Sequence, residues 1–335
     1  MLKECTGIAE TEASGVLARV RRMLENDSTS DNAPTAPSPR GEGTARGPLS
    51  NWCNRRRFRL ALEFDGAVVG LATDSIRIAD LIVRRFGYIG GMARPSDSPH
   101  WILIESNATQ FSVSSATGLI RLGNENELDA YLLHEIVECA IRQFSPLIVL
   151  HAGAVARAGV GIVLMAPSGA GKTTLTGVLA RSGFEYLGDD VVPIAADDYA
   201  VIPVPMPLCA KAGSWPLLDP DNRTATAIRL GRDTRYIVPE TSSTAKLRAY
   251  VVVCPRYQSD LGAAELRPLG TVEKLQTLVA SESLRTPGLD CARLARIVEW
   301  MGTVEAWSMD YGDTDSAVET IARLAERRGS TGASR

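Results

Sequence analysis

Paired cysteines and long apolar runs are both missing from this 335-residue chain. Its six cysteines lie far apart and none forms a CxxC pair, so a zinc site or a disulfide framework has little support. No segment approaches the roughly 18–20 apolar residues that a membrane-spanning helix needs. The first 25 residues carry four glutamates and no continuous apolar core, which argues against a secretory signal. We therefore expect a reduced, cytoplasmic protein.

A large excess of charge of either sign is also missing. Lys and Arg number 36 against 39 Asp and Glu, for a net charge of −3. This balance argues against bulk binding to nucleic acid or to an anionic membrane, so neither is expected as a partner. The 45 % of hydrophobic and 22 % of charged residues are ordinary for a globular protein and exclude a wholly disordered or fibrous one.

Composition divides the chain into four parts. Apolar residues four apart predict an N-terminal helix within 1–26. Residues 27–57 are rich in Ser, Thr, Pro, Gly and Ala, too poor in apolar surface to fold, and are expected to be a disordered linker. Residues 58–145 are predicted to form an α+β region that packs on a core domain of residues 146–330.

Hydrophobic spacing predicts the elements of the last two parts. We expect strands at 58–64, 101–104, 111–113, 119–122, 147–150, 161–166, 191–194, 199–204, 250–254 and 306–309. We expect helices at 76–86, 133–144, 272–279, 291–301 and 316–325. Proline lacks a backbone donor, so Pro255 is expected to end the strand before it.

The most informative stretch is 165–174, Met-Ala-Pro-Ser-Gly-Ala-Gly-Lys-Thr-Thr. It matches G-x-x-x-x-G-K-[ST], with Ala166 in place of the first glycine, and lies between an apolar strand and a helical pattern. Glycines let successive amides face a phosphate, the lysine neutralises phosphate charge, and the first threonine can ligate Mg²⁺. We predict nucleotide binding by Ser168, Gly169, Ala170, Gly171, Lys172, Thr173 and Thr174.

A pair of carboxylates follows soon after this loop. Asp189 and Asp190 come 17 and 18 residues after Lys172, and phosphoryl transfer needs a carboxylate for Mg²⁺ and often a second as proton acceptor. Asp197-Asp198, between two strand-like runs, is interpreted as a plain hairpin turn.

Histidines are few, and only His151 is a candidate for function. It stands at the end of an apolar strand, 21 residues before Lys172. His100 and His134 are interpreted as structural, and His134 is expected beside Glu135 and Glu138 on the polar side of its helix.

The histidine, the loop and the aspartate pair, in this order and spacing, resemble the catalytic domain of HPr kinase/phosphorylase. The loop and the Gly-Asp-Asp triplet also resemble ATP-dependent phosphoenolpyruvate carboxykinase. The resemblance covers about 151–192 and extends more weakly over 208–220 and 250–278. It is greatest to HPr-kinase-related kinases of bacterial gene clusters, some of which phosphorylate lasso precursor peptides on serine. The Glu-Val-Arg-Gly-type signature of the bifunctional enzymes is absent, so the resemblance does not extend to phosphorylase activity or to HPr as substrate.

The resemblance implies an α/β (α+β) fold with a P-loop kinase core, a mixed sheet flanked by helices. It implies that Asp189 is the general base, that Asp190 and Thr173 ligate Mg²⁺, and that His151 lies near Asp189 and the phosphates. Related bifunctional enzymes form oligomers, so a homo-oligomer is expected as well.

Basic residues between 211 and 235 are candidates for stabilising transferred phosphate. We choose Arg235 because strand-like residues follow it; the others are Lys211, Arg223, Arg229 and Arg232.

The function expected is that of an ATP- and Mg²⁺-dependent kinase acting on a Ser or Thr hydroxyl of a small protein or peptide. Two alternatives stay open: a kinase for a small molecule such as a free amino acid, and a nucleotide-binding regulatory module without turnover.

Overall fold

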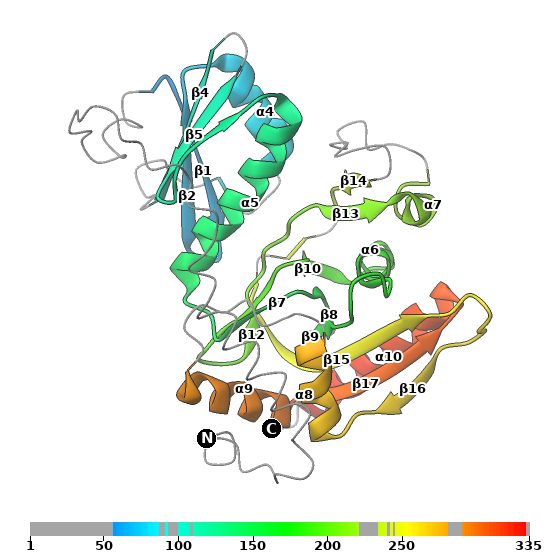
Figure 1. Ribbon diagram of the computed structural model, residues 1–335. Helices are drawn as coiled ribbons and strands as arrows, with labels where there is room; N and C mark the ends of the chain where they lie inside the picture. Colours follow the sequence, from blue (N-terminus) through cyan, green and yellow to red (C-terminus); the bar gives the residue numbers. More distant parts are fainter. Residues whose placement is uncertain are drawn as a thin grey trace.

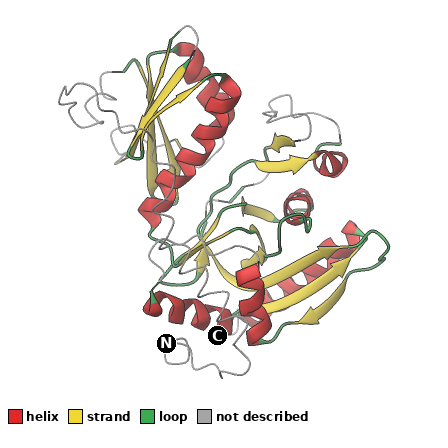
Figure 2. Cartoon of the chain, in the orientation of Figure 1, coloured by secondary structure: helices red, strands yellow, loops and turns green. Residues whose placement is uncertain are grey.

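A computed structural model describes residues 56–86, 91–92, 100–107, 110–220, 234–239, 242–243, 245–280 and 290–332. The predicted helix within 1–26 and nearly all of the predicted linker 27–57 lie outside these ranges. The described part combines α-helices with several β-sheets, two of them mixed (Figure 2). None of its helices is both long and apolar enough to cross a membrane.

The first sheet has the strand order β3-β1-β2-β4-β5-β6. Its strands are β1 (Phe58–Phe64), β2 (Ala67–Thr73), β3 (Gly91–Met92), β4 (His100–Ser106), β5 (Phe111–Ser115) and β6 (Gly118–Leu122). Asp65 and Gly66 both have positive φ and form the turn between β1 and β2, as expected for an Asp-Gly pair. Helices α4 (Ile76–Phe86) and α5 (Glu125–Phe144) accompany this sheet (Figure 1).

Helix α5 begins eight residues earlier than its apolar spacing predicted, at Glu125. Asn124 caps it: the amide of Glu127 donates to the Asn124 side chain, and the Glu127 carboxylate accepts from the amide of Gly123. These bonds satisfy helix amides that would otherwise lack partners. At the other end, Ser145 adopts a left-handed conformation and Pro146 follows, so the helix stops where predicted.

The second sheet has the strand order β10-β8-β9-β15-β12-β11-β7, with β17 beside β15 and β16 beside β17. Its strands are β7 (Ile148–Leu150), β8 (Gly153–Arg157), β9 (Val160–Leu164), β10 (Glu185–Asp189), β11 (Val192–Ile194), β12 (Ala200–Val201), β15 (Leu247–Tyr257), β16 (Glu265–Pro268) and β17 (Glu305–Tyr311). A separate ribbon pairs β13 (Leu208–Lys211) with β14 (Thr234–Ile237).

Helices cover both faces of the second sheet. On one face, α8 (Thr271–Ala280) and α9 (Cys291–Thr303) pack on Val163 and Val252. On the other, α6 (Lys172–Arg181) and α10 (Thr314–Gly332) pack on Ile162 and Val253 (Figure 1). Neighbouring residues of a strand point to opposite faces, so β9 and the stretch 251–253 of β15 are apolar because both of their faces are buried.

The expectation that Pro255 ends its strand is wrong. Strand β15 continues to Tyr257, and Pro255 lies opposite Met309 of β17. Pairing with β9, on the other side of β15, ends at Val253. Pro255 is thus at an edge position of the strand, where the donor that proline lacks is not needed.

The two sheets are joined through a shared core. Val204 and Met206, which follow the second sheet's β12, are buried in the same cluster as Leu132 and Ile136 of α5. The Tyr186 hydroxyl of β10 donates to the carbonyl of Met206 over 2.6 Å. Helix α5 therefore lies between the first sheet and the segment after β12 that carries Val204 and Met206.

Candidate functional site

The glycine-rich loop joins β9 to α6. Strand β8 is antiparallel to both β9 and β10, so β9 and β10 are parallel and their carboxyl ends meet at one edge of the sheet. Gly169 and Gly171 have φ of 87° and 89°, a conformation that side chains with a Cβ seldom adopt. Ala166 is buried and has no positive φ, which explains why alanine serves where the motif usually has glycine.

Lys172 is the first residue of α6 and is buried. Its Nζ donates to the carbonyl oxygen of Ala166 over 2.6 Å and to that of Pro167 over 3.3 Å. These bonds hold the ammonium across the loop. No side chain caps the N-terminal amides of helix α6. Its partly positive N-terminus can therefore interact with an anion bound at the loop.

Asp189 ends β10 and is only 2 % exposed. Neither of its carboxylate oxygens has a hydrogen-bond partner of good geometry among the described residues. Burial, followed by the charge of Asp190, raises the pKa of Asp189 well above its usual range, and Thr173 and Lys172 only partly oppose the rise. A buried carboxylate without well-formed hydrogen bonds is costly and is typical of a group that binds a ligand or a proton.

Asp190 is about half exposed and has φ of 64°, a strained conformation for a residue other than glycine. His151 lies beside it: the ring Nδ1 is 3.3 Å from the Asp190 carbonyl oxygen and 3.8 Å from its Oδ1. The sequence predicted that His151 lies near Asp189. In the structure, its ring contacts the neighbouring residue, Asp190.

Oxygen ligands for Mg²⁺ are present at this edge. The Thr173 hydroxyl lies close enough to Asp189 to lower the pKa of that carboxyl, and Asp190 is the next residue. No group of three His, Cys, Asp or Glu side chains able to hold a metal gathers within the described ranges. Mg²⁺ commonly uses one or two carboxylates together with substrate phosphates, and the adjacent carboxylates of Asp189 and Asp190 beside Thr173 fit such a site.

Arg235 is not brought to this carboxylate edge. It lies on β14, where its guanidinium carbon is 3.9 Å from the centre of the Trp215 ring. Its neighbour Tyr236 faces Asp190, whose charge contributes to raising the pKa of Tyr236 after the larger effect of burial. Adjacent side chains of a strand point to opposite faces, so Arg235 points away from the pair, and its role in transfer stays a prediction. Arg223, Arg229 and Arg232 lie outside the described residues.

The rest of the loop is tied to the helix that carries Trp215. Thr174 shares a short hydrogen bond of 2.5 Å with the hydroxyl of Ser214, which precedes α7 (Trp215–Leu218). Ser168 and Ala170 lie on the loop itself, with Ser168 exposed. The seven residues predicted to bind nucleotide therefore form one continuous turn and helix start.

Two tyrosines beside the loop were missed by sequence reasoning. Tyr257 and Tyr311 end the parallel strands β15 and β17 opposite each other, with ring centres 5.6 Å apart. A Cβ at Gly171 would lie 3.3 Å from the Tyr311 hydroxyl. No local motif marks them, since only the pairing of β15 with β17 brings them to the loop.

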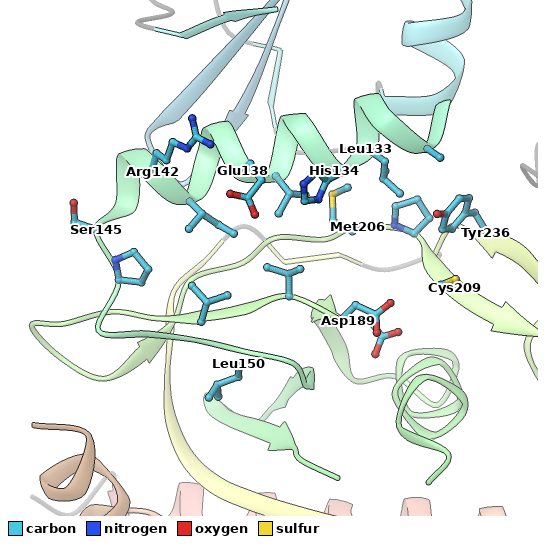
Figure 3. A pocket seen from close by; sticks show the side chains of 18 of the residues that line it. Leu133, His134, Glu138, Arg142, Ser145, Leu150, Asp189, Met206, Cys209 and Tyr236 are labelled. Carbon is cyan, nitrogen blue, oxygen red and sulfur yellow. The ribbon is translucent and has the colours of Figure 1, made fainter. Parts of the chain in front are cut away.

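A pocket of about 530 Å³ opens beside the aspartate pair. One wall is α5, which contributes Leu133, His134, Val137 and Glu138, and Asp189 lies on the wall opposite (Figure 3). We name it the α5 pocket. Glu135, expected on the polar side of α5, is instead buried and accepts hydrogen bonds from Thr117 and Tyr131. The four-residue spacing of His134, Glu138 and Arg142 was the available signal for this wall.

No protein-family model matches the chain, and no curated protein sequence shows significant similarity to it.

Proposed function

We propose that this protein is an ATP- and Mg²⁺-dependent kinase that transfers the γ-phosphate to a Ser or Thr hydroxyl of a small protein or peptide. The proposal includes a P-loop kinase core of the HPr kinase/phosphoenolpyruvate carboxykinase type for residues 146–330. It is carried by one observation: a buried carboxylate without a hydrogen bond of good geometry, Asp189, ends the strand whose carboxyl end shares an edge with the lysine-bearing glycine loop.

Each residue at this edge has a role in the proposal. Loop amides and the N-terminus of α6 bind phosphate oxygens, and Lys172 neutralises their charge. Thr173 and Asp190 hold Mg²⁺, which supplies charge neutralisation at the phosphates when bound. Asp189, buried at the end of β10, accepts the proton of the acceptor hydroxyl.

The transfer is balanced in atoms. A bond forms between the acceptor oxygen and the γ-phosphorus, and the bond from that phosphorus to the oxygen bridging to the β-phosphate breaks. ADP leaves, and the hydroxyl proton passes to Asp189.

Labelled phosphate transfer from γ-³²P-ATP with Mg²⁺ tests the proposal. Lys172→Ala should weaken ATP binding more than tenfold. Asp189→Asn should keep ATP affinity within a few-fold but lower transfer by about 10²–10⁴, the contribution of a general base. Asp197→Asn is the matched control, because Asp197 belongs to an exposed turn between β11 and β12. Transfer by Asp189→Asn at the wild-type rate would contradict the role of Asp189.

A small-molecule acceptor is the second candidate, because about 530 Å³ is within the range of pockets for small ligands. Free serine therefore belongs among the acceptors. ATP binding without transfer to any acceptor would instead favour a regulatory module without turnover.

A further inference from the structure

Glu138 is the feature of the α5 pocket that the kinase proposal leaves unused. It is half-buried on the wall formed by α5, and its carboxylate points into the pocket (Figure 3). Within the part of the chain that the structure describes, it has no hydrogen bond and no ion pair. Its neighbours one turn away, His134 and Arg142, also line the pocket and are exposed, and the Arg142 guanidinium points away from Asp189 in Figure 3.

A second carboxylate lies across the pocket. Asp189 is almost fully buried, and neither of its oxygens makes a hydrogen bond of good geometry with the described residues. The lining thus carries carboxylates on both walls, Glu138 on one and Asp189 with Asp190 on the other, together with the basic Arg142 and Arg293. A carboxylate that is shielded from water is stabilised most by a positively charged hydrogen-bond donor. Glu138 accordingly fits an ammonium or guanidinium group of a ligand whose hydroxyl is at Asp189.

The wall between these points is apolar. Leu133 and Val137 of α5, with Leu150 and Met206 from the core, line it. The aliphatic stem of lysine or arginine packs on such a surface while its charged end reaches an acidic group. The volume of about 530 Å³ is much larger than one serine, so a short peptide segment fills it better than a free amino acid.

We propose that the α5 pocket binds a peptide acceptor that carries a lysine or arginine near the phosphorylated residue, with the basic side chain paired to Glu138 and the Ser or Thr hydroxyl at Asp189. This inference rests on the proposed kinase function. Phosphate is transferred by the bond changes given above. The pairing with Glu138 determines which peptide binds and takes no part in the bond changes.

The test uses the full chain, γ-³²P-ATP, Mg²⁺ and an oriented peptide library with a central serine. Wild-type protein should select Lys or Arg at one fixed position. Glu138→Gln should raise KM for the selected basic peptide about 10-fold or more, as expected for losing a charged hydrogen bond, with a smaller effect on kcat. Glu138→Lys should shift the selection at that position to Asp or Glu. Glu319→Lys, on the exposed side of α10, is the matched control and should leave the selection unchanged.

The outcomes separate the two proposals. ATP binding by wild-type protein is measured independently by equilibrium dialysis, and transfer is compared with Asp189→Asn. Asp189-dependent transfer with the same residue preference in wild type and Glu138→Lys would overturn the pairing and keep the kinase. Label on free serine alone would overturn the peptide acceptor. Absence of both ATP binding and transfer would overturn both.

Discussion

The backbone conformation at individual positions limits which residue types the glycine-rich loop can contain. Gly171 has φ of 89° and faces the Tyr311 hydroxyl, whereas Ala166 needs no left-handed conformation. Asp190 adopts a left-handed conformation without being glycine, which places its carbonyl beside His151. Strain of this kind persists where neighbouring structure holds it, and it is frequent at functional sites.

We expect Gly171→Ala to weaken ATP binding more than tenfold. The added Cβ would lie 3.3 Å from the Tyr311 hydroxyl, and the left-handed conformation costs alanine about 1–2 kcal/mol. Isothermal titration with ATP and Mg²⁺ measures the affinity.

Gly183→Ala is the matched control for that measurement. Gly183 has nearly the same φ, 87°, but a Cβ there meets nothing within 4 Å and it follows the far end of α6. The control should lose a similar amount of folding stability with its ATP affinity unchanged. Equal affinities for Gly171→Ala and wild type would remove the loop from the nucleotide site.

At the scale of one element, α5 has two unlike buried sides. Toward the first sheet, its Gln143 side chain accepts from and donates to the backbone of Val68. The same side buries Asp129, which is 2 % exposed and has Arg85 at 3.5 Å as its recorded ion pair. Toward the core, the helix lines the α5 pocket.

We expect Asp129→Asn to stabilise the protein at neutral pH. Burial raises the pKa of Asp129 to about 6 from an ordinary 3.8, with Arg85 opposing the rise. The folded state therefore favours the protonated acid, so stability from this group is present below about pH 4 and is lost as pH rises through 6. At pH 7 the variant should gain about 1–3 kcal/mol.

Urea unfolding at pH 4 and pH 7 measures this gain. It should nearly vanish at pH 4, where wild-type Asp129 is already largely neutral in the folded state. Asp260→Asn, an exposed carboxylate on the loop after β15, controls for the loss of one negative charge. A gain of the same size at both pH values would contradict the assignment to Asp129.

At the scale of the whole molecule, the two sheets share buried side chains. Val204 belongs to the chain after β12 but is fully buried among residues of α5 and the first sheet. Lys246, just before β15, also pairs with Asp65 in the turn between β1 and β2, over 2.9 Å. The region 58–145 is thus packed on the core through a hydrophobic cluster as well as surface charge.

We expect Val204→Ala to loosen both parts together. Removing a fully buried side chain leaves a cavity and costs about 1–3 kcal/mol. Hydrogen exchange followed by mass spectrometry should show faster exchange in β2 and in β10. Val253→Ala, also fully buried but within the second sheet's core, should affect β9 and β10 with much less effect on β2. Faster exchange in only one part for Val204→Ala would show that the two unfold independently.

The sequence pattern predicted those features whose determining residues lie close together in the chain. The spacing of apolar residues predicted α4 over its full length, and β7, β9, β11, β17, α8 and α9 to within two residues at each end. It did not predict β8, β10 or β16, and α10 ends seven residues later than predicted. The loop at 165–174 was recognised because its glycines and lysine are neighbours. The start of α5 was missed although Asn124 and Glu127 mark it, because the prediction followed apolar spacing and not the cap.

Tertiary structure decided the features that depend on distant segments. Pro255 continues a strand because β9 stops pairing before it, which hydrophobic pattern does not encode. Tyr311 reaches the loop only through the pairing of β15 with β17. Glu138 and Asp189, 51 positions apart, line one pocket only because α5 packs against the core. The periodicity of a helix or strand depends on neighbouring residues, so the sequence shows it directly. The walls of a site depend on which faces of distant helices and strands pack together.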